Sequence, residues 1–440
     1  MTSQTLSRPK LRPYQIEGVK FLRSGRHKVL MDDPGLGKTA QTVVAFDSLG
    51  AQSIVIVCPP AVKTMWEDQV PFWSKTKRRI HVVMHMHEWI PDEAQVVILG
   101  YSNLLSPMIL DQLLARRWAV GVADEIHFCS NPDAKRTKAL LGTKGLWTKC
   151  GFFWGLTGTP MTNTPVDLYP LAATIGRKVF KSESKWYWFT KRYCGRYKTR
   201  FGYVCKGATN QAQLRKKLFD SGMCLRRLKS DVLDELPDRQ YRIIRLNNTG
   251  RKEITWNKEL KVSEFGQVET SASAAEIAQL RFELGWEKVS FLIDYASEVL
   301  NQREKIIIFT WHRKVTESLA FELYMRGYET CTYYGSMTPK AKEKSKRSFT
   351  HGSSRVFIAN IASAGTGIDG LQHVCDYAIY AELPWTFVEI MQSTDRIWRI
   401  GQTKNVISDL PVIDKQVEHK MIVALMKKQN VFSNLLLTSG

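Results

Sequence analysis

The chain has 440 residues, which is enough for two or three domains with cores of their own, so no disulfide or structural metal is needed for stability. Its 63 Lys and Arg exceed its 42 Asp and Glu, and the net charge of +21 predicts a polyanionic partner, either nucleic acid or an anionic membrane surface. Hydrophobic residues make up 44% of the chain and charged residues 24%, which excludes a wholly disordered protein.

The sequence also indicates the cellular compartment of the protein, through its lack of targeting segments and its cysteine pattern. The sequence contains no run of about 18 apolar residues, so no transmembrane helix is predicted. Residues 1–10 are polar and contain Pro, unlike a secretory signal. The eight cysteines form no CxxC pair and no zinc-ligand spacing with His. These features predict no membrane association and no structural metal. They also predict a reducing, intracellular location. A bacterial or host cytoplasm is expected, and a nucleus is also compatible. The short length favours a bacterial or viral source.

The first series of predicted elements precedes residue 160. Short apolar runs predict strands at 28–31, 53–58, 96–101, 119–123 and 152–156. Helical spacing occurs between them, for example at 40–49 and 62–72. Continuous apolar strands that alternate with helices are typical of a parallel sheet with helices on both faces.

The rest of the chain contains a middle segment without a strand series and then a second series of predicted strands. Residues 161–300 show no clear strand series; 181–206 are dense in aromatic and basic residues, and 271–300 have helical spacing. Strands are then predicted at 305–310, 329–333, 355–359, 377–381 and 406–410. We therefore expect an α/β protein with lobes over 1–160 and 301–440, and helical insertions and a connector over 161–300.

Residues 32–39, Asp-Asp-Pro-Gly-Leu-Gly-Lys-Thr, follow a predicted strand and open a helix, as a phosphate-binding loop requires. The glycines let backbone amides approach a triphosphate, Lys38 can reach the β and γ oxygens, and the Thr39 hydroxyl can bind Mg²⁺. The general pattern would place Gly where this chain has Asp32, and the alternative is a glycine-rich turn with an incidental lysine. The predicted ATP-binding residues of this loop are Asp33, Pro34, Gly35, Leu36, Gly37, Lys38 and Thr39.

Two carboxylates follow the strand at 119–123. Asp124, at the end of a buried strand, suits Mg²⁺, which takes oxygen ligands. Glu125 would orient and deprotonate the attacking water. The alternative is an Asp-Glu pair in a solvated loop, and the pattern gains specificity only from its place downstream of the phosphate loop.

Two arginines near the C-terminus form the third group. Arg396 and Arg399 are three residues apart and would share one face of a helix. From across a cleft they would stabilise the charge that develops on the γ-phosphoryl oxygens. The alternative is a solvated helix face.

Together these segments resemble the superfamily 2 helicase motors and, within them, the Swi/Snf-type ATPases, over nearly the whole chain. Further segments of the resemblance are 11–19, 58–66 and 155–160. Two others, 223–237 and 396–402, are specific to the Swi/Snf branch. Short strings at 192–194, 202–203 and 380–385 resemble the annealing-helicase or fork-remodelling subgroup. The chain departs from the family at Pro34, where Met is usual, and within 360–371, which affects the coupling of nucleotide to DNA.

The resemblance implies two RecA-like lobes with parallel sheets, and ATP with Mg²⁺ bound between them. It implies an adenine contact for Gln15, nucleotide contacts for Gly367 and Asp369, and catalytic roles for Lys38 and Glu125 with the two arginines. The residues expected to couple hydrolysis to lobe movement are His127, Thr157, Gly158, Thr159 and Gln392.

The net charge fits a groove that grips DNA phosphates across both lobes. The predicted DNA contacts are Lys63, Trp66, Arg313, Lys314, Lys342 and Lys346. A solvated helix face is an equal alternative for the lysine run at 340–347. For the aromatic and basic residues at 186–203, a small core of their own is favoured over stacking on exposed bases.

The predicted function is that of an ATP-dependent motor on double-stranded or forked DNA that works as a monomer and remodels or reanneals forks. The alternatives are a strand-separating DNA or RNA helicase, a nucleotide-gated DNA-binding clamp without motor activity, and a membrane-surface ATPase. The last lacks a basic amphipathic anchor helix.

Overall fold

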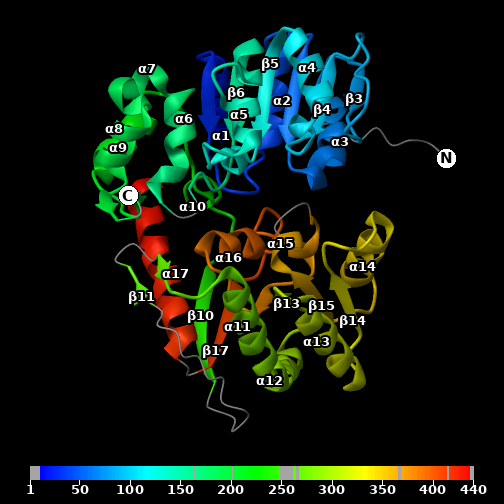
Figure 1. The fold of residues 1–440 in the computed structure, drawn as a ribbon. Coiled ribbons are helices and arrows are strands. Elements are labelled where there is room, and N and C mark those ends of the chain that lie inside the picture. The colour runs from blue at the N-terminus through cyan, green and yellow to red at the C-terminus, as the bar shows by residue number, and fades with distance from the viewer. Residues whose placement is uncertain are drawn as a thin grey trace, which may run out of the picture. The chain divides into compact units, whose positions relative to one another are not determined.

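The computed structural model describes residues 10–161, 164–200, 202–246, 261–263, 267–364, 368–413 and 416–436. The described chain forms two compact units (Figure 1). Unit 1 contains the residues up to Val232 and those from Val431 onward, and unit 2 contains Leu233–Asn430. The middle segment at 161–300 therefore contributes to both units. No helix in these described ranges is long and apolar enough to cross a membrane.

Unit 1 is built on a parallel sheet that has seven strands among the described residues, in the order β3-β4-β2-β5-β6-β1-β9. The strands are β1 His27–Leu30, β2 Ile54–Cys58, β3 Ile80–Val82, β4 Val96–Gly100, β5 Trp118–Asp124, β6 Cys150–Leu156 and β9 Cys224–Leu225. The accompanying helices are α1 Pro13–Arg23, α2 Lys38–Ser48, α3 Lys63–Trp73, α4 Pro107–Ala115 and α5 Lys135–Leu141. The predicted strands and helices before residue 160 are confirmed, with ends that shift by one or two residues.

The register of unit 1 positions the site. β1 pairs with β6 and β6 with β5, so that Leu30 lies beside Leu156 and Leu156 beside Asp124. The segments that follow these three strands therefore leave the sheet at one edge, which is where ligands bind in parallel α/β sheets.

A helical group with one hairpin extends unit 1 (Figure 1). It contains α6 Tyr169–Ala173, α7 Arg177–Phe180, α8 Trp186–Tyr193, α9 Gln211–Phe219 and the antiparallel strands β7 Arg196–Thr199 and β8 Gly202–Cys205. After it the chain returns to the sheet as β9, which pairs with β1, and α10 Lys229–Val232 follows.

Unit 2 contains a second parallel sheet, with six strands in its described part, in the order β10-β17-β16-β13-β15-β14. The strands are β10 Arg239–Leu246, β13 Ile306–Thr310, β14 Thr330–Tyr333, β15 Val356–Asn360, β16 Tyr377–Tyr380 and β17 Val406–Ile413. The helices are α11 Ala274–Glu287, α12 Val289–Gln302, α13 Arg313–Met325, α14 Pro339–His351, α15 Ile361–Ala364, α16 Phe387–Thr394 and α17 Gln416–Leu436, of which the residues from Val431 onward belong to unit 1. The five predicted strands of this series and the predicted helical segment at 271–300 are confirmed.

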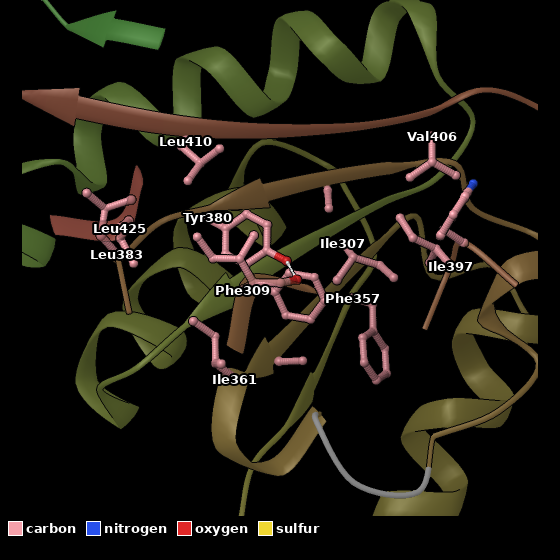
Figure 2. Packing of buried hydrophobic residues seen from close by; sticks show 14 of the residues in the cluster. Ile307, Phe309, Phe357, Ile361, Tyr380, Leu383, Ile397, Val406, Leu410 and Leu425 are labelled. Atoms are coloured by element: carbon pink, nitrogen blue, oxygen red, sulfur yellow. Dashed lines mark hydrogen bonds between the residues drawn. The ribbon is translucent and has the colours of Figure 1, made fainter. Parts of the chain in front are cut away.

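Alternate residues of the central strands fill two cores. Ile307 and Phe309 pack with Phe357 and Tyr380 on one face of the sheet (Figure 2). Ile306 and its neighbours on the other face pack against α12 and α13. Strands buried on both faces need apolar residues throughout, which is why they were recognisable in the sequence.

The strand β10 was missed in the sequence. It pairs in parallel with β17 along its length, from Arg239 beside Val406 to Leu246 beside Ile413. Its sequence, Arg-Gln-Tyr-Arg-Ile-Ile-Arg-Leu, mixes arginines with apolar residues because it lies at the edge of the sheet and is mostly part-exposed. A search for continuous apolar runs cannot find such a strand.

Candidate nucleotide site and its coupling groups

The loop between β1 and α2 has the backbone of a phosphate-binding loop. Gly35 and Gly37 have φ values of 88° and 75°, in the left-handed region that favours glycine. A Cβ at Gly37 would lie 2.4 Å from the side-chain nitrogen of Gln15. The helix α2 begins at Lys38, so its free N–H groups and the positive end of its dipole lie at the loop.

Lys38 and Gln15 both contact this loop. The Lys38 Nζ donates to the carbonyl oxygens of Asp32, at 2.7 Å, and Asp33, at 3.2 Å. The buried Gln15 side chain donates to the carbonyl of Leu36, at 3.3 Å, and accepts from the backbone N–H of Arg12. The structure thus brings Gln15 onto the loop, 21 residues away from its partner in sequence.

Asp124 ends β5 in a buried setting at the same edge of the sheet. It accepts a hydrogen bond from Trp66 Nε1 at 2.8 Å, and the Tyr101 hydroxyl donates to its backbone carbonyl. Burial, and then the neighbouring Glu125 carboxylate, raise the pKa of Asp124 to about 6, although Lys38 acts in the opposite direction. A divalent cation at this carboxylate would offset the buried charge, so the donor set fits Mg²⁺ held by Asp124 and the Thr39 hydroxyl.

Glu125 occupies a strained backbone position and is held by hydrogen bonds. Its φ of 51° is unusual for a residue with a side chain, and such strain is frequent at active sites. The Thr157 hydroxyl donates to Glu125 Oε2 at 3.3 Å, and His127 Nδ1 lies 3.2 Å from the same oxygen. His127 Nδ1 is also 2.9 Å from Thr157 Oγ1. The segment after β6 therefore touches the carboxylate predicted to act on water.

The same segment reaches the phosphate loop. Thr157 Oγ1 accepts from the backbone N–H of Thr159 at 3.0 Å, and Thr159 Oγ1 lies 3.4 Å from His127 Nδ1. A Cβ at Gly158 would lie 2.7 Å from Pro34 Cγ, so glycine is required by the close approach of the two loops. Four of the predicted coupling residues are thus brought together around Glu125 and Pro34.

Two arginines that the sequence analysis left without a role bind the start of the phosphate loop. Arg226 donates to Asp33 Oδ1 at 3.0 Å and to the carbonyl of Met31 at 2.7 Å. Arg227 donates to both carboxylate oxygens of Asp32 and, at 2.8 Å, to Gln41 Oε1. Both guanidinium groups are buried, so they compensate the two buried aspartates. These contacts explain why this chain has Asp rather than Gly at position 32.

The predicted groups of unit 2 are Gly367, Asp369, Gln392, Arg396 and Arg399. Arg399 pairs with Asp369 at 3.1 Å, and Gln392 lies on α16. Gly367 lies outside the described residues. The expectation that Arg396 and Arg399 share a helix face is wrong, because α16 ends at Thr394 and both arginines lie in the turns that follow.

Neighbouring side chains explain this early helix end. Asp395 pairs with Arg239 at 3.1 Å, and Trp398 Nε1 donates to the carbonyl of Pro237 at 2.8 Å. These contacts draw the chain after α16 toward the segment that leads into β10.

The two predicted DNA contacts of unit 1 are buried in the structure and stay predictions. Trp66 is fully buried, and Lys63 is buried with its amine donating to the carbonyl of Val83 at 2.8 Å. Both residues lie on α3, and Trp66 packs in the core of unit 1.

The predicted DNA contacts of unit 2 stay predictions. Arg313 and Lys314 are exposed at the start of α13, where Arg313 pairs with Glu317 at 2.7 Å. Lys342 and Lys346 lie part-exposed on α14, and Lys346 is 3.5 Å from Glu343.

Comparisons with known proteins place these observations in a family. The SNF2-related domain matches residues 14–290, more than half of the chain, and the Helicase conserved C-terminal domain matches 287–401. The chain is 28% identical to the "SWI/SNF-related matrix-associated actin-dependent regulator of chromatin subfamily A-like protein 1" of Bos taurus, over 90% of this chain and 42% of that protein. It is also 28% identical to the "DNA annealing helicase and endonuclease ZRANB3" of Mus musculus, over 98% of this chain and 41% of that protein.

The chain therefore spans less than half the length of these relatives. Among solved structures, the Sulfolobus solfataricus SWI2/SNF2 ATPase core in complex with dsDNA is 21% identical, with a TM-score of 0.47 over 98% of each chain.

Proposed function

The chain belongs to the SNF2-related family of helicase-type ATPases, and from this premise we propose that it is an ATP-dependent motor that translocates on double-stranded DNA. The observation that carries the proposal is the group of residues at the carboxyl edge of the unit 1 sheet, where Lys38 follows β1, and Asp124 and Glu125 lie at the end of β5, with β6 between the two strands. A nucleotide-gated clamp without motor activity would not need Glu125 held by the coupling residues Thr157 and His127.

The proposed chemistry assigns one task to each group. The loop amides and Lys38 bind the triphosphate, and Gln15 faces the adenine side. Mg²⁺ held by Thr39 and Asp124 neutralises phosphate charge when bound. Glu125 orients the attacking water and takes its proton. Arg396 and Arg399 of unit 2 stabilise the charge that develops on the transferred phosphoryl group. With Gly367 and Asp369, they complete the proposed site.

DNA is the proposed partner because the +21 charge suits a phosphate track and because one relative carries the name of a DNA annealing helicase. We propose that forked or junction DNA is remodelled or reannealed, that Arg313, Lys314, Lys342 and Lys346 contact phosphates, and that one chain suffices. The eight cysteines are free thiols and six of them are buried, which supports a reducing compartment.

The deciding experiment measures ATP hydrolysis by the wild type, Lys38→Ala and Glu125→Gln with duplex DNA, forked DNA, single-stranded DNA and RNA. We expect duplex and forked DNA to stimulate the wild type, and both variants to lose the stimulation while they still bind DNA. Wild-type turnover in either variant contradicts the site. Stimulation by RNA alone, or strand separation coupled to hydrolysis, favours a strand-separating helicase instead.

A further inference from the structure

The aromatic–basic patch of unit 1, made of Tyr187, Trp188, Lys191, Arg196 and Tyr203, has no role in the proposed ATPase site. It lies on α8 and on the β7–β8 hairpin, far along the chain from the phosphate loop. Its rings are unusually exposed for aromatic side chains, at 44% for Tyr187, 47% for Trp188 and 59% for Tyr203. An exposed aromatic cluster of this kind marks an interaction site more often than a structural feature.

The core of the helical group does not need these rings. Phe180, Phe189 and Tyr193 are fully buried and pack on one another, with ring centroids 5.2 to 6.3 Å apart. Phe189 and Tyr193 lie on one side of α8, and Tyr187 and Trp188 are exposed on the other. The sequence-based expectation that these aromatics form a core is thus correct for the buried set and wrong for the exposed set.

Cations hold the exposed rings in a fixed arrangement. The Arg196 guanidinium lies 4.7 Å from the ring centre of Tyr187 and 3.8 Å from that of Tyr203, so it connects the helix to the hairpin. Lys191 Nζ lies 5.7 Å from the ring centres of both Tyr187 and Trp188. Such contacts orient the rings before any ligand binds, which lowers the entropy cost of binding.

The two faces of the hairpin differ. Lys198 pairs with Tyr203 across the hairpin, and Arg196 lies two residues before Lys198, so these three share one face. Tyr197 pairs with Val204 and lies on the opposite face, although it is also exposed, at 48%. Tyr197 is therefore a matched control for Tyr203, because it lies on the same hairpin, is similarly exposed and faces the other way.

The base of the hairpin is held by hydrogen bonds and a close backbone contact. The N–H of Gly207 donates to the carbonyl of Cys194 at 2.9 Å, and a Cβ at Gly195 would lie 3.0 Å from the Cα of Gly207. The side chains of Thr209 and Asn210 both donate to the carbonyl of Arg192, at 2.7 and 2.8 Å. An isolated two-stranded hairpin is marginally stable, and these contacts fix it to α8.

The stretch of sequence that carries the patch is strongly basic, and Glu183 at its start pairs with Arg192 and Lys217. No Asp or Glu occurs between Glu183 and Asp220 in the sequence. The same stretch contains ten cationic residues: Lys185, Lys191, Arg192, Arg196, Lys198, Arg200, Lys206, Arg215, Lys216 and Lys217. A ligand for this surface therefore carries negative charge and offers flat groups that can stack.

We propose that the aromatic–basic patch binds unpaired nucleotides of DNA, with bases stacked on Tyr203, Tyr187 and Trp188 and phosphates near the adjacent cations. Base-on-ring stacking beside a cationic track is how proteins bind single strands without reading sequence. Duplex DNA hides the faces of its bases, so the rings would add nothing on a plain duplex. The inference rests on the proposed function, which identifies the polymer as DNA. The patch would give the motor a place to hold the single-stranded arm of a fork.

The experiment measures binding without nucleotide, by fluorescence anisotropy, of an oligothymidylate of about 20 nucleotides and of a blunt duplex of about the same length. The proteins are the full chain and its Tyr203→Ala, Tyr203→Phe and Tyr197→Ala variants. We expect Tyr203→Ala to weaken oligothymidylate binding by about five- to a hundred-fold. We expect Tyr203→Phe, which keeps the ring, and Tyr197→Ala, on the opposite face, to bind like the wild type. Duplex binding should be unchanged in all of them.

Three results would overturn the proposal: no oligothymidylate binding by the wild type, equal binding by Tyr203→Ala, or equal losses in Tyr203→Ala and Tyr197→Ala. The second result is also expected if the patch recognises an acidic protein surface. Because the assay involves no hydrolysis, it is independent of the ATPase test. A protein that binds the oligomer through Tyr203 but shows no DNA-stimulated hydrolysis would contradict the motor and leave the patch intact.

Discussion

Arg227 donates hydrogen bonds to both carboxylate oxygens of Asp32, which lies 195 residues earlier in the chain. Asp32 lies at the start of the phosphate loop, and Arg227 lies shortly before Val232, where unit 1 gives way to unit 2 along the chain. The ion pair therefore links these two segments. Both side chains are buried, so neither charge is solvated by water. The phosphate loop of unit 1 is therefore built from two distant parts of the sequence.

Arg227→Ala should strongly destabilise the protein. The substitution leaves the Asp32 carboxylate buried without its partner, which costs about 3 to 5 kcal/mol. Arg227→Lys should recover only part of the loss, because an ammonium group cannot reproduce a planar fork shared by Asp32 and Gln41. Urea unfolding measures the difference. Arg313→Ala, at an exposed ion pair, is the control and should leave the midpoint unchanged. An unchanged midpoint in Arg227→Ala would contradict the role of this pair.

Thr157→Val should separate ATP binding from turnover. The hydroxyl of Thr157 donates to Glu125, accepts from the Thr159 N–H and contacts His127 Nδ1, so valine, which has nearly the same shape, removes all three contacts. We expect the ATP affinity to change less than about two-fold and DNA-stimulated kcat to fall by about 10- to 100-fold, because Glu125 loses its orientation. Steady-state kinetics with duplex DNA gives the split. Thr148→Val, which removes a hydroxyl that donates to the Gly145 carbonyl at 2.8 Å, serves as the control.

Nucleotide binding that depends on Mg²⁺ should weaken as the pH falls through about 6. The pKa of Asp124 is raised to about 6 by burial and by Glu125, so the carboxylate is protonated below this pH and no longer offers a charged ligand. The Mg²⁺ concentration needed for half-maximal binding of a fluorescent ATP analogue should rise roughly ten-fold for each pH unit below 6. A requirement that stays flat between pH 5 and pH 7.5 would show that Asp124 does not bind the metal.

The same carboxylate should reduce stability at neutral pH. A folded-state pKa above the ordinary value of 3.8 means that folding favours the protonated form, so the stability is full below about pH 4 and is lost as the pH rises through 6. Asp124→Asn removes this loss while it keeps an oxygen for Trp66. It should therefore raise the unfolding free energy at pH 8 by on the order of 2 kcal/mol, and not at pH 4. Thermal unfolding at the two pH values checks the sign.

The sequence predicted those parts of the molecule that are governed by local rules. Continuous apolar runs such as 54–58 and 306–310 identified strands because both faces of a parallel sheet are buried. The turn chemistry of Gly35 and Gly37 identified the phosphate loop because few other residues adopt that backbone. In both cases, the cause lies within a few residues of its effect.

What depended on distant contacts was not predictable. The roles of Arg226 and Arg227 come from partners more than 190 residues away. The turn at Arg396 comes from the contacts of Asp395 and Trp398 with 237–239. The edge strand β10 lacked a continuous apolar run because, among the described residues, it has a neighbouring strand on one side only. Composition showed that 186–203 was aromatic and basic, but only the register of the hairpin separates Tyr203 from Tyr197.

Trp66→Phe should change the metal dependence of the protein and leave its affinity for DNA unchanged. The indole N–H donates to Asp124 Oδ2 at 2.8 Å and stabilises the ionised carboxylate, so its loss raises the pKa of Asp124 further. The rise in Mg²⁺ requirement should then begin at a higher pH than in the wild type, and the unfilled bond should cost about 1 to 3 kcal/mol of stability. Trp89→Phe, at a tryptophan that is 66% exposed, is the matched control and should alter neither property. A Trp66→Phe protein with wild-type metal dependence and weakened duplex binding would instead support the sequence-based assignment of Trp66 to DNA.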